Sequence, residues 1–201
     1  MIGTYRLKNC FQKDYSFVPT ISQTPSIIIN SKDMKNVSID KIFHQLMPER
    51  TVFVISYDKK NNRPSGMVAG YNTKCSSVPA MFAVGLWKKG YTNKLIRQSK
   101  EFVVAVPNKK LEKAVEFFGS THGDKVNKFM ETKLKTLPAK HLKSPLLVEA
   151  TINLECKLVK EIDSGDHIIF IGKILAAYHN DKKKILMNMG KIDGKRIFKE
   201  F

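Results

Sequence analysis

Two polar runs near the middle of the chain carry residue types that suit the binding of a phosphate monoester. The first, residues 71–77 (YNTKCSS), places several hydroxyls, an amide and one ammonium group close together. The second, residues 88–92 (KKGYT), leads into an expected helix, so Thr92 and the first free backbone N–H groups can face an anion beside two lysines. On spacing alone, a solvated loop with a threonine N-cap explains the same residues and is the simpler interpretation.

The sequence lacks the common catalytic and metal-binding signatures. It contains no GxGxxG, GxxxxGK[ST], HExxH or GxSxG pattern, and its histidines and carboxylates form no obvious pair. Cys10, Cys75 and Cys156 lie far apart without a CxxC, which disfavours a zinc site or a disulfide framework and favours a reducing, intracellular location. For Cys75 we expect a buried or half-buried structural role in preference to a reactive thiol. We therefore predict no catalytic side chain and no metal.

The elements that must position these residues are expected to be mostly strands. Strands are predicted at residues 51–57, 67–73, 80–86, 102–107, 146–159 and 167–178, a polar turn at 58–66, and short helices at 38–46, 92–99 and 109–118. Because no alternating βαβ order appears, the pattern favours a mainly β fold, an antiparallel barrel with short peripheral helices, over a doubly wound sheet. Residues 1–40 are polar and irregular, so we predict an N-terminal extension that adds a strand at 26–30 and wraps a single domain at 41–201.

Four segments in register link the chain to a known family. These are TVFVISY with a turn ending in Gly66, MVAGYNTKCSSVPAMFAVGL, KKGYTNKLIRQSKEFVVAVP, and GSTHGDKVNKF. The second contains Thr73, Ser76 and Pro79 in a Thr-x-x-Ser order followed by proline. With these segments, residues 44–180 resemble the flavin reductase-like, FMN-binding split β-barrel family, which includes the flavoredoxins. Ala80 and Ala105 depart from the family pattern, where proline and asparagine are common.

The resemblance implies a split β-barrel of Greek-key type with FMN in a groove at its edge, near a homodimer interface. The positions that match the family pattern are Met67, Ala69, Gly70, Tyr71 and Asn72 for the flavin ring, Thr73 and Ser76 for the ribityl chain or phosphate, and Lys88, Lys89 and Thr92 for the phosphate. Ser120, Thr121 and Lys125 either join the phosphate site or cap the following helix, and both interpretations stay open.

The implied activity belongs to the flavin, so no side-chain base is required. NAD(P)H is expected to pass hydride to flavin N5, and the electrons then go to free flavin or to a protein acceptor. A flavin reductase or a flavoredoxin-like electron carrier fits this scheme. The alternative from a different class is a basic β-barrel that binds nucleic acid and has no redox activity.

The charge of the chain is strongly positive and unevenly distributed. Its 35 Lys and Arg residues against 18 Asp and Glu give a formal net charge of +17. Residues 51–100 hold nine basic residues and a single acidic one, Asp58. This segment includes the predicted phosphate site, so its field favours a phosphorylated cofactor and can steer NAD(P)H or an acidic electron-transfer partner. With no long apolar run and no apparent signal segment, we expect a cytoplasmic protein without a membrane partner.

Overall fold

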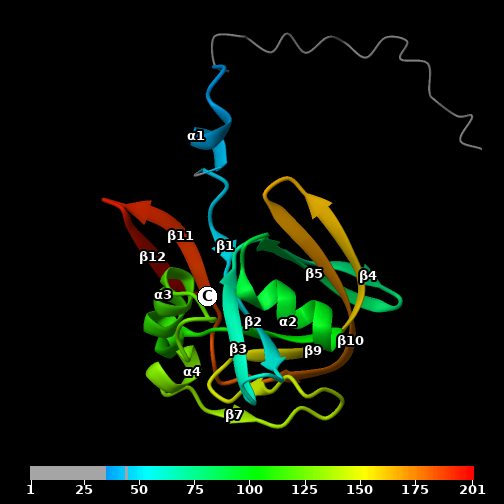
Figure 1. Cartoon of the computed structure of the whole chain (residues 1–201). Helices are drawn as coiled ribbons and strands as arrows, with labels where there is room; N and C mark the ends of the chain where they lie inside the picture. The colour runs from blue at the N-terminus through cyan, green and yellow to red at the C-terminus, as the bar shows by residue number, and fades with distance from the viewer. Residues whose placement is uncertain (1–34, 44) are drawn as a thin grey trace, which may run out of the picture. The chain divides into compact units, whose positions relative to one another are not determined.

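The computed structural model describes residues 35–43 and 45–201 (Figure 1). The chain divides after Val37 into two units, and the unit from Ser38 to Phe201 contains every described helix and strand. The predicted strand at 26–30 and the predicted wrapping by the extension lie outside the described residues. None of the described helices is long and apolar enough to cross a membrane.

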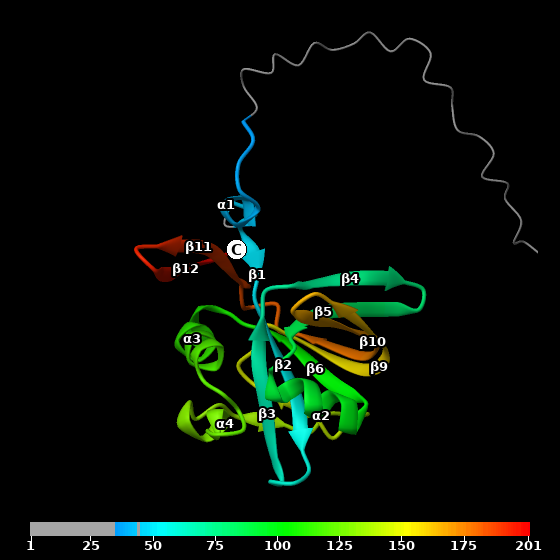
Figure 2. The same ribbon diagram turned by 45° about the horizontal axis from the view of Figure 1, so that its top comes forward.

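An antiparallel seven-stranded sheet forms the centre of the fold, in the order β3-β2-β6-β9-β10-β5-β4. Its strands are β2 (Val52–Asp58), β3 (Arg63–Ala69), β4 (Asn72–Ser77), β5 (Ala80–Trp87), β6 (Glu101–Val106), β9 (Ile152–Ser164) and β10 (His167–His179). The two edge strands, β3 and β4, are not paired with each other, so the curved sheet remains open (Figure 2). The predicted mainly β fold class is confirmed.

Two smaller sheets and short helices surround this sheet (Figure 1). The first small sheet contains β1 (Glu49–Arg50), β11 (Leu186–Ile192) and β12 (Lys195–Glu200), and the second contains β7 (Thr136–Leu137) and β8 (Leu146–Leu147). The helices are α1 (Ile39–Phe43), α2 (Tyr91–Ser99), a 3-10 turn at Lys109–Leu111, α3 (Glu112–Ser120) and α4 (Lys128–Glu131). The β11–β12 hairpin and the β4–β5 hairpin extend on opposite sides of the central strands in Figure 2.

The core lies on both faces of the central strands, which explains why β2 is buried along nearly its whole length and begins with four consecutive apolar residues. On one face, Phe53 meets Phe118 of α3 edge to face at 5.1 Å between ring centroids, and Phe118 meets Phe129 of α4 at 5.3 Å. On the other face, Phe102 and Phe170 are fully buried. These aromatic contacts fix α3 and α4, and with them the loop between the two helices, against the sheet.

The predicted strand at 67–73 is wrong in one informative respect: the chain turns a corner at Gly70 and Tyr71. Asn72 holds this corner, because its Nδ2 donates to the carbonyl oxygens of Arg50 (2.6 Å) and Gly70 (2.8 Å). The preceding turn is also shorter than predicted, since β3 already begins at Arg63. Pro64 is tolerated inside β3 because that strand is an edge strand and pairs only with β2.

Candidate functional site

The larger of two adjoining cavities lies where β3 ends, beside β5, β10 and the β11–β12 hairpin. It encloses about 610 Å³. Its lining combines apolar and aromatic side chains with polar and charged ones: Phe43, Leu46, Met47, Glu49, Met67, Val68, Ala69, Gly70, Tyr71, Gly85, Trp87, His167, Asn188, Gly190, Lys191 and Arg196. Such a lining suits a flat aromatic ligand that also presents hydrogen-bonding groups.

Two glycines along this cavity make room for neighbouring side chains. A Cβ at Gly70 would lie 2.6 Å from Oε1 of Glu49, and a Cβ at Gly85 would lie 3.0 Å from Cβ of Tyr71. The corner at residues 70–71 therefore depends on glycine for the close approach of neighbouring side chains.

His167 is a cavity residue that sequence reasoning missed. Its ring lies 5.0 Å from the ring of Tyr71, and its Nδ1 lies 2.6 Å from Oδ1 of Asp166. The hydrogen bond with His167 lowers the pKa of the Asp166 carboxyl. The sequence signal that could have identified His167 is its neighbour Asp166, at the turn between β9 and β10, because a carboxylate beside a histidine can orient the imidazole.

The smaller cavity encloses about 240 Å³ and shares Met67, Val68 and Trp87 with the larger one. The rest of its lining comes from β3, the start of α2, the end of α3 with the loop that follows it, and α4: Gly66, Gly90, Tyr91, Thr92, Phe118, Gly119, Ser120, Thr121, His122, Gly123 and Lys128. Four of these residues are glycines, and a Cβ at Gly123 would lie 2.9 Å from Oγ of Ser65. Backbone therefore forms much of the wall.

The N-terminus of α2 gives this smaller cavity a favourable environment for an anion. Gly90 at the N-cap provides no side-chain hydrogen bond, and the first turn of the helix contains no acidic residue. The helix dipole and the unpaired N–H groups of the first turn therefore favour negative charge. Tyr91 fixes the helix start, because its hydroxyl donates to Oδ2 of Asp58 at 2.9 Å. Burial acts to raise the pKa of Asp58, but hydrogen bonds from Asn61 and Tyr91 leave it lowered overall.

Lys128 supplies the cation of the smaller cavity. Only 4% of the residue is exposed, and its Nζ donates to the carbonyl oxygen of Phe118 at 2.8 Å. Burial lowers the pKa of this ammonium group to about 8. Sequence reasoning selected Lys125 instead, which is exposed and lines neither cavity. Lys128 and Phe129 end the segment GSTHGDKVNKF, which carries part of the family resemblance, and this position was the sequence signal that could have identified Lys128.

The structure brings together most of the predicted ring residues and part of the predicted phosphate residues. Those that line one or both cavities are Met67, Ala69, Gly70 and Tyr71 for the ring, and Thr92, Ser120 and Thr121 for the phosphate. Asn72 instead holds the chain corner. Thr73 and Ser76 lie on β4 and line neither cavity.

The two predicted phosphate lysines point to other partners. Nζ of Lys88 lies 2.7 Å from Oδ1 of Asp163, and Nζ of Lys89 lies 5.8 Å from the centroid of the Trp87 ring. Neither lysine lines a cavity in this arrangement. Both side chains are long and close to the N-terminus of α2, so they contribute to the positive field around it.

Ser120 and Thr121 bond to the preceding helix, so the alternative that they cap the following helix is wrong. Their hydroxyls donate to carbonyl oxygens at the end of α3, Ser120 to Glu116 at 2.9 Å and Thr121 to Phe117 at 2.7 Å. The following helix, α4, is capped by Asn127. A hydroxyl that donates to a carbonyl retains lone pairs but has no proton left to offer an anion.

Cys75 is exposed on β4, which contradicts the expected buried or half-buried role. It lies at an irregularity in the pairing of β4 with β5, between Lys74 and Ser76. Cys156 is fully buried, and burial raises the pKa of its thiol to about 12.

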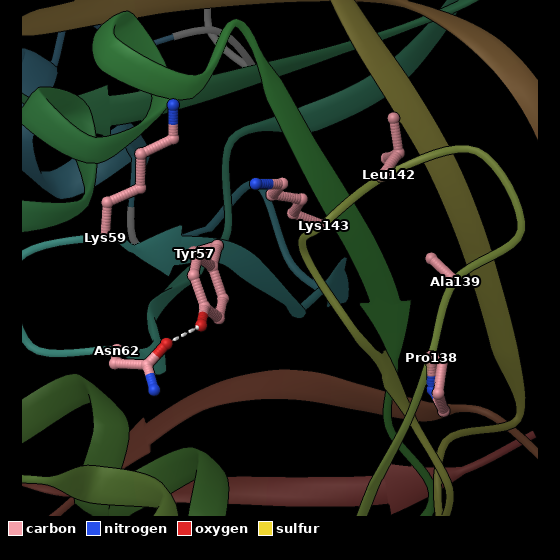
Figure 3. A pocket seen from close by; sticks show the side chains of 7 residues that line it. All are labelled: Tyr57, Lys59, Asn62, Pro138, Ala139, Leu142 and Lys143. Carbon is pink, nitrogen blue, oxygen red and sulfur yellow. Dashed lines mark hydrogen bonds between the residues drawn. The ribbon is translucent and has the colours of Figure 1, made fainter.

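A third cavity lies near Tyr57, at the end of β2 that is farther from the larger cavity, and it shares no lining residue with the other two (Figure 3). It encloses about 510 Å³ and is lined by Tyr57, Lys59, Asn62, Pro138, Ala139, Leu142 and Lys143. The Tyr57 hydroxyl donates to the Asn62 side chain, as the dashed line in Figure 3 shows. The polar groups around this third cavity are exposed, which distinguishes it from the partly enclosed pair of cavities.

An open antiparallel barrel with a ring-sized cavity beside an anion-favouring helix N-terminus is the arrangement of a flavin-binding split barrel. A family model described as "Flavin reductase like domain" matches residues 44–193. The chain therefore belongs to the flavin reductase-like family, which supports a flavin-related oxidoreductase.

Individual relatives agree with this assignment. An uncharacterised protein of Archaeoglobus fulgidus is 38% identical over 139 residues, covering 69% of this chain and 77% of the relative. The ferric-chelate reductase (NAD(P)H) of the same organism is 32% identical over 123 residues, covering 59% of this chain and 70% of the reductase. The solved FMN-binding protein from Thermus thermophilus with bound p-hydroxybenzaldehyde has a TM-score of 0.71 at 21% identity, covering 83% of this chain and 94% of that protein. This last similarity concerns the fold.

Proposed function

We propose that the chain binds FMN across the two adjoining cavities and transfers electrons from NAD(P)H to free flavin or to a protein acceptor. One observation carries this proposal: a larger cavity lined by aromatic, apolar and polar groups and a smaller anion-favouring cavity share Met67, Val68 and Trp87. A ligand with a flat ring system at one end and a phosphate at the other matches that division. The Thermus relative, described as an FMN-binding protein, supports the choice of FMN.

The residues present fit the two ends of FMN. The larger cavity offers Tyr71 and Trp87 for contact with a ring, and Glu49 and Asn188 for hydrogen bonds at the edge of that ring. In the smaller cavity, the N–H groups of α2, Thr92 and the ammonium group of Lys128 supply donors for a phosphate. When bound, FMN supplies the hydride and electron transfer.

The protein's own part is to hold the two rings and to exclude water. Met67 and Trp87 separate the two cavities and offer apolar contact to a ring. Tyr71 and His167 form an aromatic pair on the wall of the larger cavity and are our candidates for contact with the nicotinamide. Lys191 and Arg196, a cross-strand pair on β11 and β12, line the same cavity and suit the phosphates of a dinucleotide.

We further propose that a second copy of the chain completes the site. Apolar and aromatic side chains are exposed on the β4–β5 side of the sheet, with Val78 94%, Tyr71 59% and Trp87 41% accessible. Tyr71 and Trp87 also line the larger cavity, so a copy packed on this side buries them and encloses the ligand. The positive charge of residues 51–100 suits an acidic acceptor protein.

Reconstitution tests the proposal directly. Purified protein is titrated with FMN and, separately, with riboflavin, which lacks the phosphate, and quenching of flavin fluorescence gives each Kd. FMN is expected to bind at least tenfold more tightly than riboflavin, and the loaded protein is expected to oxidise NADH or NADPH anaerobically while its flavin absorbance bleaches. Protein that stays colourless with excess FMN contradicts the proposed function, and equal affinity for the two flavins contradicts the phosphate assignment.

A further inference from the structure

Glu49 places a carboxylate in the larger cavity at a position set by strand pairing. It belongs to β1, and its register partner on β11 is Asn188, far away in sequence. Asn188 Nδ2 donates to Oε1 of Glu49 at 2.8 Å. Asn188 is only 5% exposed, and its Oδ1 accepts a hydrogen bond from the backbone N–H of Gly190 at 3.0 Å. This second bond fixes which way the amide faces, so Glu49 receives an N–H donor.

The second carboxylate oxygen is directed along the bare backbone of Gly70. A Cβ built on Gly70 would lie 2.9 Å from Oε2 of Glu49, so the carboxylate lies against the face of that glycine. Among the described residues, no donor to Oε2 is found, and neither Lys191 nor Arg196 forms an ion pair with Glu49, although both line the cavity. Glu49 is half-buried and lines the larger cavity, so its Oε2 is available to accept a hydrogen bond from a ligand that replaces solvent there.

We infer that Glu49 is a specificity-determining residue that accepts a hydrogen bond from an amide or imide N–H of the bound ring ligand. This inference rests on the proposed function, because that function puts such a ligand in the larger cavity. Two sources share the required chemistry: the imide edge of the flavin and the carboxamide of the nicotinamide. An ionised carboxylate only accepts hydrogen bonds, so it favours an N–H group and repels a ligand that carries a carboxylate at the same place.

Paired ligands that differ at this one group test the inference. FMN is compared with N3-methyl-FMN, in which a methyl group replaces the imide proton. NAD⁺ is compared with nicotinic acid adenine dinucleotide, in which a carboxylate replaces the carboxamide, on FMN-loaded protein. Each Kd is measured for the wild type, for Glu49→Ala and Glu49→Gln, and for Glu116→Gln, a matched control at an exposed position of α3 that lines neither cavity.

The wild type and Glu116→Gln are expected to discriminate at least tenfold within one of the two pairs. Glu49→Ala is expected to reduce that discrimination to less than threefold, with Glu49→Gln between the two. Loss confined to the flavin pair identifies the imide as the bound group, and loss confined to the dinucleotide pair identifies the carboxamide.

Two results overturn the inference while the proposed function stands. In the first, the wild type binds FMN but discriminates within neither pair. In the second, Glu49→Ala discriminates as strongly as the wild type. Failure of the wild type to bind any FMN refutes the proposed function and this inference together, so the two failures are distinguishable. Circular dichroism and thermal unfolding of Glu49→Ala separate a change in recognition from a loss of folded protein.

Discussion

Lys128 provides the sharpest test of where the phosphate lies, because its charge disappears within an accessible pH range. Burial lowers the pKa of its ammonium group from 10.5 to about 8 in the ligand-free protein. The side chain is therefore about nine-tenths protonated at pH 7 and about one-tenth protonated at pH 9. The phosphate monoester of FMN stays a dianion throughout this range, since its second pKa is about 6.

A dianion beside Lys128 favours the protonated ammonium and raises its pKa in the complex. By linkage, binding above pH 8 must then take up a proton, so the Kd for FMN is expected to rise with pH, by up to about tenfold per pH unit until the pKa of the complex is reached. One charge-assisted hydrogen bond contributes about 1.5–3 kcal/mol, which limits the total loss to between about tenfold and a hundredfold.

The assay is fluorescence titration of FMN at half-unit steps from pH 7 to pH 9.5. Riboflavin is the control ligand, because it reports every pH effect at the ring and none at the phosphate. Lys128→Met is expected to bind FMN weakly with a flat profile, and Lys128→Arg to give a flat profile because arginine keeps its charge. A flat wild-type profile, or the same slope for riboflavin, refutes the placement of the phosphate beside Lys128.

Four further predictions follow from the packing and the titratable groups. Because the pKa of Lys128 is lowered in the folded protein, the unfolded chain binds more protons than the folded one between about pH 8 and 10.4. The free energy of unfolding of the ligand-free protein is therefore expected to rise across that window, by about 1–2 kcal/mol after solvent screening. Urea titrations of Lys128→Met should show no such rise. Burial acts to raise the pKa of Glu155, but hydrogen bonds from Tyr178, Lys140 and His141 leave it lowered overall. The ionised Glu155 therefore stabilises the folded protein above the ordinary pKa range of glutamate, and this stabilisation is lost as the pH falls. Glu155→Gln should lower the free energy of unfolding by about 1–3 kcal/mol at pH 7 and much less at pH 3. Gly172→Ala places a Cβ 2.6 Å from Cζ of Phe102 and 2.7 Å from Cβ of Cys156, so calorimetry should show a Tm lower by several degrees. In a Cys10→Ala background, maleimide should label Cys75 rapidly in the folded protein and Cys156 only on unfolding, so unchanged labelling after a further Cys75→Ala change contradicts the exposed position of that thiol.

Much of the sheet follows from local pattern, because strands buried on both faces read as continuous apolar runs. The segments that became β2, β5 and β6 were predicted to within one or two residues for this reason. The corner at residues 70–71 was missed, since it depends on hydrogen bonds from Asn72 to Arg50, a contact between segments that no local pattern reports.

The sequence predicted the site residues that are close together along the chain, and it missed those that strand pairing brings in from distant segments. Residues 67–71 and Thr92 line the cavities because they end a strand and begin a helix. Glu49, His167 and Arg196 reach the larger cavity only through pairing of strands that are far apart in sequence. The choice between Lys125 and Lys128 required knowing which turn of the 124–131 segment faces α3, and tertiary packing decides that.

The contact between Glu49 and Gly70 links the evolutionary histories of two positions on different strands. While a glutamate stays at position 49, a Cβ at position 70 would lie less than 3 Å from its carboxylate, so a substitution at position 70 requires the Glu49 side chain to move away. Shortening residue 49 first removes the obstacle and opens position 70 to alanine or serine. Among sequences related to this chain, a residue larger than glycine at position 70 should therefore be found together with a residue other than glutamate at position 49.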